Sequence, residues 1–531
     1  MSSSCLLDEG SMSSEGSIQA MFRSSRAVVW RHDSTALNRD CRLRDTALSP
    51  NALLVRAWRS LIELRLDDAL VTIAQFEAEI ARSLAAVAPR SREFAKVLRA
   101  VLLVLQSQDG ATVRAALAVL ESRHRSGGKS SALAAALRIG YFKIRDLDRY
   151  YAVPRLKHAV PTHRGTHGLA TIIGPTFEAV VEAEQLRLAV ATRLARSAHE
   201  RAVSRFGRRS PVTARAAGVL AELLYEEGHR TGLDALVMES LSAVRTSGDQ
   251  ESALRGYRVL ARLAARRGDR EFAFLVLKEA EVLAAARDWA GMMAESLVVR
   301  TQLLLEEGRT HDAAICAEHI GTLARERPGE PLHASHALAR AQVLVATGNA
   351  CRAVTVLREL QAASCGERNN YRALRLSVQL ADALLGSGDR AEGRAMLVQA
   401  LQVGARAGLY QTFVDAGAHV SELLLSLHHA TPQDRRLPPE LRPYIECILA
   451  DRAEERAPTS PTRASRVMDS LSPREHSILR SMSCGLSNKR IAQELQIAPE
   501  TVKSHVKGIF IKLAVQTRAH AVSTANALGL L

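Results

Sequence analysis

Two lysines near the end of the chain are the residues best suited to chemistry on a polyanion. Lys503 and Lys507 are four positions apart, so on a helix from Pro499 to Leu513 they would share one face. Protonated amines donate hydrogen bonds to phosphate oxygens and to acceptors on base edges. The apolar residues of the predicted helix form a separate stripe that must face a core: Val502, Val506, Ile509 and Leu513. Both lysines are therefore expected to project into solvent.

A helix is predicted before this segment, because its start carries strong capping signals. Ser472 and Glu475 have the spacing of a capping box, and Pro473 stands at the first helical position. The helix is expected to run to about Met482 and to be closed by Gly485.

Two more helices complete a four-helix unit. Ser487 is expected to cap a helix from Asn488 to Gln496, and Thr517 a final helix that ends near Gly529. Two short helices joined by a tight turn, the second with outward lysines, are typical of a helix-turn-helix, here residues 487–506. Such a motif places its second helix in the major groove of DNA.

The charge balance favours the same partner. The chain has 531 residues, 71 Lys and Arg against 56 Asp and Glu, and a pI near 9.9. Residues 465–531 alone hold nine basic and four acidic residues, so the tail is the most basic part relative to its length. A basic excess around a predicted helix-turn-helix favours nucleic-acid binding.

A fixed step of forty residues organises the region before the tail. The step separates five glycines: Gly228, Gly268, Gly308, Gly348 and Gly388. Seven residues before each glycine stands a small residue: Ala221, Ala261, Thr301, Ala341 and Ala381. A glycine that ends one helix and small residues that let the next lie close predict a helix hairpin. Because neither helix can bury its apolar face alone, the hairpins must stack into a solenoid.

The hairpin spacing is typical of tetratricopeptide repeats, although the usual period there is ~34 residues, and HEAT-like pairs remain an alternative. Residues 52–80 and 98–124 read as degenerate copies, and 147–168 as a break in the array. Aromatic residues make up 4% and hydrophobic residues 47% of the chain, so its apolar content is mostly Leu, Ala and Val, which favours helices over a β-fold. The predicted fold class is all-α.

Composition divides the chain into four parts. Residues 1–50 are serine-rich without apolar periodicity, and we expect them to be disordered. The helical array is expected over 51–450, with its clearest repeats at 215–415. A linker at 451–466 and the DNA-binding domain at 467–531 follow.

Other chemistries find little support. SGGKSS (126–131) lacks the first glycine of a phosphate-binding loop, and His158, His163 and His167 have no cysteine or carboxylate nearby. Motifs of hydrolases and zinc peptidases do not occur, so we expect no enzyme, no cofactor and no metal. Seven scattered cysteines without a C-x-x-C pair indicate a reducing compartment, and no apolar run is long enough for a membrane span.

The tail resembles the LuxR-type helix-turn-helix family. The segments LSPRE, GLSNKxIAxEL, TVKSHVxxIFxKL and RAHAV occur in that family's order and spacing. The upstream array resembles, less closely, the helical-repeat sensor of MalT-like LuxR regulators, here without the ATPase module that precedes it in those proteins. The resemblance implies a cytoplasmic, nucleoid-associated transcriptional regulator of bacteria, most often an activator.

The resemblance also implies specific partners and site residues. It implies double-stranded DNA bound as a homodimer, RNA polymerase as a partner, and a small-molecule or protein effector at the array. The residues that would contact base edges are Lys503, Ser504 and Lys507. Those that would contact phosphates are Ser487, Asn488, Lys489, Thr501 and Arg518. An interaction scaffold that binds DNA only incidentally remains the alternative.

Overall fold

The computed structural model shows an all-α protein. It describes residues 49–525 outside 83–87, 107–108, 127–130, 145–146, 154–169, 231, 328–329, 364–369, 430–437, 439–440, 457–472, 484–485, 496, 499, 504, 507–508, 510–517, 519–520 and 523–524. Every regular element within these residues is a helix, which confirms the predicted fold class. The expected disorder of residues 1–50 falls almost wholly outside the described part.

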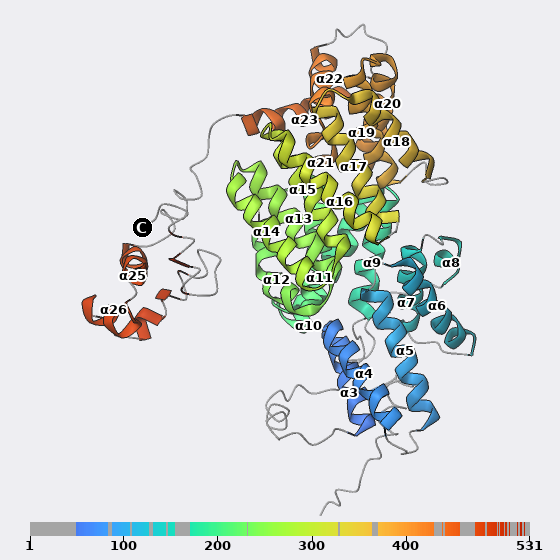
Figure 1. The fold of residues 1–531 in the computed structure, drawn as a ribbon, viewed down its shortest axis with the longest axis vertical. Coiled ribbons are helices and arrows are strands. Elements are labelled where there is room, and N and C mark those ends of the chain that lie inside the picture. Colours follow the sequence, from blue (N-terminus) through green and yellow to red (C-terminus); the bar gives the residue numbers. More distant parts are fainter. Residues whose placement is uncertain are drawn as a thin grey trace, which may run out of the picture. The chain divides into compact units, whose positions relative to one another are not determined.

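Helix hairpins follow one another along the array (Figure 1). The early helices are α3 (Pro50–Ile62), α4 (Leu66–Arg82), α5 (Pro89–Gln106), α6 (Gly110–Arg125), α7 (Ser131–Lys143), α8 (Leu147–Ala152), α9 (Ala170–Glu184) and α10 (Leu188–Phe206). The regular part comprises α11 (Pro211–Glu226), α12 (Leu233–Ser247), α13 (Gln250–Arg266), α14 (Arg270–Ala286), α15 (Ala290–Glu306), α16 (Thr310–Glu326), α17 (Glu330–Ala346), α18 (Ala350–Ala363), α19 (Tyr371–Ser387) and α20 (Arg390–Ala407). The predicted solenoid of hairpins is confirmed.

The five glycines of the forty-residue step lie in the turns within hairpins. All have a left-handed backbone, with φ between +74° and +94°. The five small residues seven positions earlier are at most 1% exposed: Ala221, Ala261, Thr301, Ala341 and Ala381. The repeat pattern therefore marks both the turns and the close helix contacts, as predicted.

Glycine is absent from the corresponding turns of two earlier hairpins. Leu64, between α3 and α4, has φ +53°, and Leu186, between α9 and α10, has φ +61°. A non-glycine residue in this conformation carries a steric penalty of about 1 kcal/mol or more. Leu64 is fully buried, so the apolar contacts of its side chain offset that penalty. The array thus begins as regular hairpins at Pro50, although its early turns lack the glycine signal.

Replacing Gly308 by alanine should destabilise the α15–α16 hairpin by about 1 kcal/mol, because φ is +74° at this residue. A Cβ atom there would meet no atom within 4 Å, so conformational strain alone would act. Urea denaturation followed by circular dichroism measures the change. Gly308→Asn is the matched control and should lose clearly less stability, since asparagine tolerates this region. Equal stability of wild type and Gly308→Ala would contradict the proposed role of the turn.

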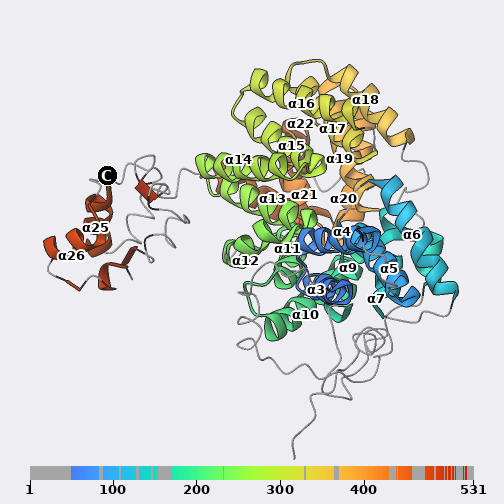
Figure 2. The ribbon, with the colours of Figure 1, turned by 60° about the horizontal axis from the view of Figure 1, so that its bottom comes forward.

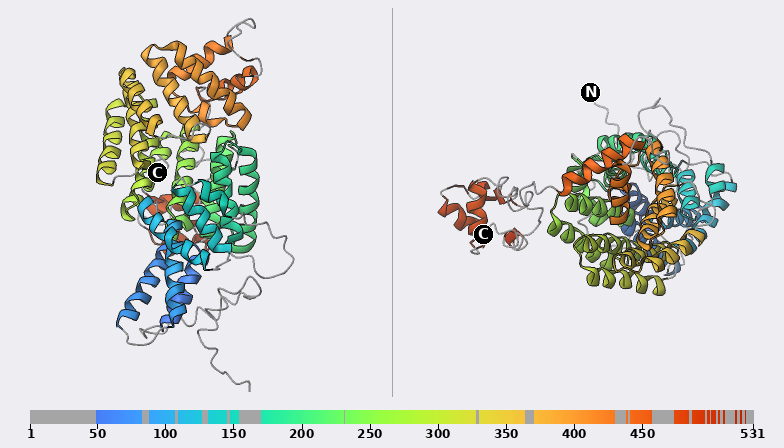
Figure 3. Two further views of the ribbon diagram at one scale, coloured as in Figure 1. Left: turned by 90° about the vertical axis from the view of Figure 1, so that its right-hand side faces the viewer. Right: turned by 90° about the horizontal axis from the view of Figure 1, so that it is seen from above.

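The array returns on itself, so that early and late helices share one core. Leu220 of α11, Leu374 of α19 and Phe413 of α21 (Gln411–Val414) belong to one buried apolar cluster. The backbone N–H of Tyr410 donates to the carbonyl of Glu226 at 3.0 Å. Figure 2 shows α11 and α21 near one another, and in the end-on view of Figure 3 the helices of the array follow one another around a central region.

Two helices follow α21 and complete this core. They are α22 (Ala418–His429) and α23 (Leu441–Arg456), and Leu441, Ile445 and Ile448 of α23 are at most 1% exposed. The helix α23 continues six residues into the predicted linker at 451–466, since the sequence there has no proline or glycine before Pro458. The remainder of that linker lies outside the described residues.

A separate C-terminal unit includes residues from Arg452 onward. Its helices with defined bounds are α25 (Pro473–Ser483) and α26 (Asn488–Glu494). Residues 500–503, 505–506, 509, 518, 521–522 and 525 are also helical. These positions fall within the third and fourth predicted helices.

Candidate DNA-binding site

One apolar core holds the elements of the C-terminal unit together. Its fully buried members include Ile478 of α25, Ile491 of α26, Val502 and Ala521. Val506 packs against this core, and Ile509 belongs to it. The apolar stripe predicted for the third helix therefore faces inward where the structure describes it, and its other faces can reach solvent. Each of the four predicted helices contributes to this core.

The start of α26 is organised by its capping residue. The Ser487 hydroxyl accepts a hydrogen bond from the backbone N–H of Arg490 at 3.4 Å, as predicted for an N-cap. Ser487 and Lys489 are exposed, whereas Asn488 is half-buried. The helix ends at Glu494, two residues earlier than expected, and Leu495 caps it.

The third helix presents Thr501 and Lys503 to solvent. Both residues are exposed, and the ammonium group of Lys503 lies 2.7 Å from a carboxylate oxygen of Glu500. The Glu500 side chain is 80% exposed and that of Lys503 60%, so water screens this pair and DNA can compete with it. Ser504 and Lys507 lie outside the described residues. The pairing with Glu500 was not foreseen, although its spacing of three residues on a helix is the usual signal.

Arg518 faces inward rather than outward. Its guanidinium donates to the carbonyl oxygens of Leu486 and Met482 and, at 3.2 Å, to Oδ1 of Asn488. Partial burial lowers the pKa of this guanidinium from its ordinary value. These bonds tie the fourth helix to the end of α25 and the start of α26. The phosphate contact expected of Arg518 stays a prediction; in the structure its guanidinium satisfies carbonyl groups of the turn. The amide group of Asn488 can still donate toward a phosphate.

Replacing Arg518 by alanine should loosen the turn between α25 and α26, because three acceptors lose a charged donor. Loss of such bonds costs about 1–3 kcal/mol. Faster hydrogen exchange of residues 473–495 in the full chain would report it, and binding to all DNA sequences should weaken together. Lys489→Ala, which removes an exposed charge without these internal bonds, is the control and should leave exchange unchanged. Unchanged exchange in Arg518→Ala, with a shallower salt dependence of DNA binding, would instead indicate direct phosphate contact.

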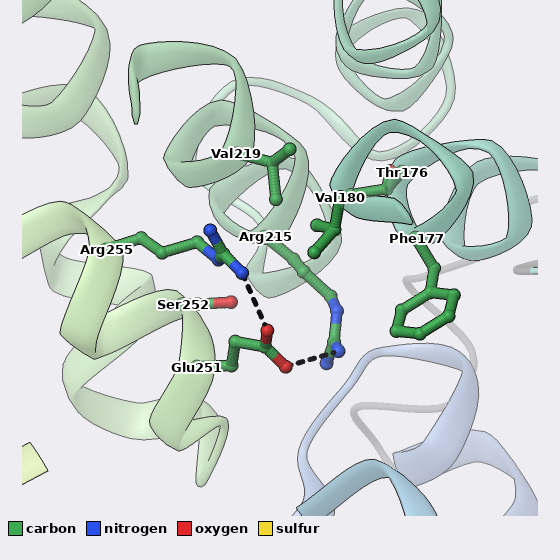
Figure 4. A pocket seen from close by; sticks show the side chains of 8 residues that line it. All are labelled: Thr176, Phe177, Val180, Arg215, Val219, Glu251, Ser252 and Arg255. Carbon is green, nitrogen blue, oxygen red and sulfur yellow. Dashed lines mark hydrogen bonds and ion pairs between the residues drawn. The ribbon is translucent and has the colours of Figure 1, made fainter. Parts of the chain in front are cut away.

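Charged side chains also meet between helices of the array. Glu251 lies between Arg215 and Arg255, with oxygen to nitrogen distances of 3.5 Å and 2.9 Å (Figure 4). Arg215 also pairs with Asp249 at 3.0 Å. Arg215, Arg255, Glu295, Ser335 and Arg375 are successive positions at the forty-residue step. The sequence analysis did not predict this polar series, because the repeat pattern rests on small and apolar residues.

The described part of the chain shows neither a candidate metal site nor a membrane-spanning helix. No group of three or more His, Cys, Asp or Glu side chains there could hold a metal ion. The three histidines at 158, 163 and 167 and most of SGGKSS fall outside that part. Across the described helices, none is long and apolar enough to cross a membrane.

These features define an all-helical repeat protein that carries a helix-turn-helix unit. A family model described as the MalT-like TPR region matches residues 93–430, and a second, bacterial regulatory proteins of the luxR family, matches residues 469–525. The first match spans more than half of the chain. The chain therefore belongs to the MalT-like TPR family and carries a C-terminal DNA-binding domain of the luxR family of bacterial regulatory proteins.

Curated relatives match parts of the chain. A probable transcriptional regulatory protein NarL of Mycobacterium tuberculosis is 48% identical over 63 residues, which cover 12% of this chain and 29% of the relative. The HTH-type transcriptional regulator MalT of Klebsiella pneumoniae is 30% identical over 214 residues, covering 36% of this chain and 22% of the relative. The nitrate/nitrite response regulator protein NarL of Escherichia coli is 36% identical over 101 residues, covering 19% and 43%. The matched region spans less than half the length of each relative.

Proposed function

We propose that this protein is a transcriptional regulator that binds specific DNA sequences as a homodimer. The third helix of its C-terminal unit enters the major groove, where Lys503, Ser504 and Lys507 contact base edges. Contacts to phosphates are made or supported by Ser487, Asn488, Lys489, Thr501 and Arg518, and Arg518 also positions Asn488 and the turn.

The observation that carries this proposal is the division of the C-terminal unit into two faces. Val502 and Ile509 are fully buried, whereas Thr501 and Lys503 on the same helix are exposed. Lys489, exposed near the start of α26, supplies a charge of the kind that binds the DNA backbone. A short helix buried on one side and basic on the other fits a groove of DNA.

The array receives the signal in this proposal. A small molecule or a protein effector binds the stacked hairpins and changes the activity of the C-terminal unit. The regulator acts as an activator in the bacterial cytoplasm, at the nucleoid, and contacts RNA polymerase at the promoter. The names of the MalT and NarL relatives, which describe a transcriptional regulator and a response regulator, support a role in regulation.

Selection of DNA from a random library by the full chain tests the proposal. A two-fold symmetric motif with half-sites one helical turn, or a multiple of it, apart is expected for a dimeric helix-turn-helix protein. An enriched motif without symmetry would support specific binding but not the dimer. Binding without any enriched motif would overturn the regulator and favour an interaction scaffold.

A further inference from the structure

The short helix α21 binds the interior of the array much as a ligand would. Its C-cap residue, Asp415, contacts three successive inner helices although 113 to 190 residues separate it from them in sequence. The helix is one turn long, and its residues Gln411, Phe413 and Val414 are buried. The array thus places a segment of its own chain against its inner side chains.

The carboxylate of Asp415 is the centre of these contacts. Its Oδ2 accepts from the Tyr225 hydroxyl of α11 at 3.2 Å and lies 3.5 Å from a guanidinium nitrogen of Arg262 on α13. Its Oδ1 accepts from the side-chain amide of Gln411 at 2.7 Å. The carbonyl oxygen of Asp415 accepts from Gln302 of α15 at 3.1 Å. A cation, a hydroxyl and an amide therefore converge on one carboxylate.

Arg262 retains capacity for further bonding. Its side chain is 21% exposed, and its buried Nε has no hydrogen-bond partner among the described residues. Burial alone would lower the pKa of this guanidinium, but Asp415 and nearby groups raise it, so the charged form persists. A long 3.5 Å contact leaves Arg262 less than optimally paired, since charge-assisted bonds are usually nearer 2.8 Å.

A second carboxylate holds the same segment by different atoms. Glu226, buried at the end of α11, accepts from the backbone N–H of Thr412 at 2.9 Å and from the Tyr371 hydroxyl at 2.8 Å. Here α21 supplies the donor, whereas at Asp415 it supplies the acceptor. The α21 segment is therefore held by a hydrogen bond that it donates to the carboxylate of Glu226 and by a carboxylate that it supplies, Asp415. An external anion can take the place only of the Asp415 carboxylate.

We propose that Tyr225 and Arg262 form a carboxylate-binding site that Asp415 occupies in the free protein and that a carboxylate-bearing small molecule occupies in the effector-bound protein. The effector's carboxylate takes these two donors, and the Asp415 side chain turns toward solvent while Phe413 stays in the core. The helices that follow in sequence, α22 and α23, lead to the C-terminal unit, so displacement of the Asp415 side chain gives the array a route to control it. That last step rests on the proposed function, whereas the carboxylate site itself does not.

Chemical rescue in the full chain tests the site without DNA. Asp415→Ala removes the carboxylate and leaves a space that formate, a carboxylate without a side chain, can fill. Sodium formate should raise the thermal midpoint of Asp415→Ala by roughly 2 °C or more over sodium chloride at equal ionic strength. Wild type, whose site is filled by its own carboxylate, should gain clearly less. In Asp415→Ala/Arg262→Met, which lacks the cation, the gain should vanish.

The control is Glu392→Ala, which removes an exposed carboxylate that pairs with Arg358 on the outside of the array. Formate should stabilise this variant no more than wild type. Equal stabilisation of all variants, or of none, would overturn the carboxylate site. Failure of the DNA selection with successful rescue would leave the site intact and overturn only the regulator.

Hydrogen exchange of wild type supplies a readout that does not depend on the variant folding. Formate in excess should compete with Asp415 and speed exchange across residues 409–416, including the Thr412 amide that bonds Glu226. Arg262→Met should remove the dependence on formate. If formate neither changes hydrogen exchange in wild type nor stabilises Asp415→Ala, external carboxylates do not enter the site.

Discussion

Lys503→Ala is expected to weaken binding to the preferred DNA site by about 1–3 kcal/mol, which is about 5- to 150-fold in Kd. The exposed ammonium group projects from the proposed recognition helix and pairs with the solvent-exposed Glu500. Because a base contact reads sequence, the loss should be larger on the selected motif than on a scrambled duplex. Fluorescence anisotropy with both duplexes at several salt concentrations measures it.

Lys489→Ala is the matched control for that experiment, since it also removes one exposed lysine from the C-terminal unit. It should weaken the two duplexes equally and make the salt dependence shallower by about one unit of slope. Glu500→Gln adds a second comparison. Removing the carboxylate frees Lys503 and reduces repulsion of phosphates, so affinity for the scrambled duplex should rise. Equal losses on both duplexes in Lys503→Ala would contradict base readout by this residue.

Arg215→Met is expected to destabilise the array by about 3–5 kcal/mol, because it leaves a buried carboxylate without its cation. The Arg215 side chain is 5% exposed and that of Asp249 1%, and their charged atoms lie 3.0 Å apart. One oxygen of Asp249 has no hydrogen-bond partner among the described residues, and the other also accepts from the Ser252 hydroxyl, which carries no charge. Chemical denaturation of the full chain measures the loss of free energy of unfolding.

The exposed pair Arg208 and Glu239 supplies the control, with similar geometry at 3.3 Å and side chains 69% and 47% exposed. Arg208→Met should change stability by no more than about 1 kcal/mol. The double variant Arg215→Met/Asp249→Asn should recover part of the loss, because the uncompensated charge is gone. A small effect of Arg215→Met alone would show that Asp249 finds water or another donor.

The turns show where sequence reasoning works and where it fails. Gly308 and its four equivalents were found because only glycine adopts φ > 0 without strain, which leaves a periodic trace in the sequence. Leu64 and Leu186 adopt the same conformation, but apolar packing holds them, and leucine carries no signal of it. The register of the early hairpins therefore required the structure.

The candidate site shows the same division. Exposure of Lys503 followed from helical periodicity, since the buried stripe on the same helix leaves one outward face. The inward orientation of Arg518 depended on the carbonyl groups of Met482, in α25, and of Leu486, in the turn before α26. Motif position alone predicts a phosphate contact for Arg518, because the sequence does not distinguish an arginine that binds phosphate from one that donates to internal carbonyl groups.

By itself the sequence determined the all-α class, the hairpin repeat and the helix-turn-helix, because helical periodicity, glycine turns and caps act over a few residues. Tertiary structure alone decided what meets across the array. Asp415 binds Tyr225 and Arg262 because the stacked hairpins curve until the late helices reach the early ones. That curvature sums small rotations over many hairpins, and no local pattern encodes the residues that it finally brings together.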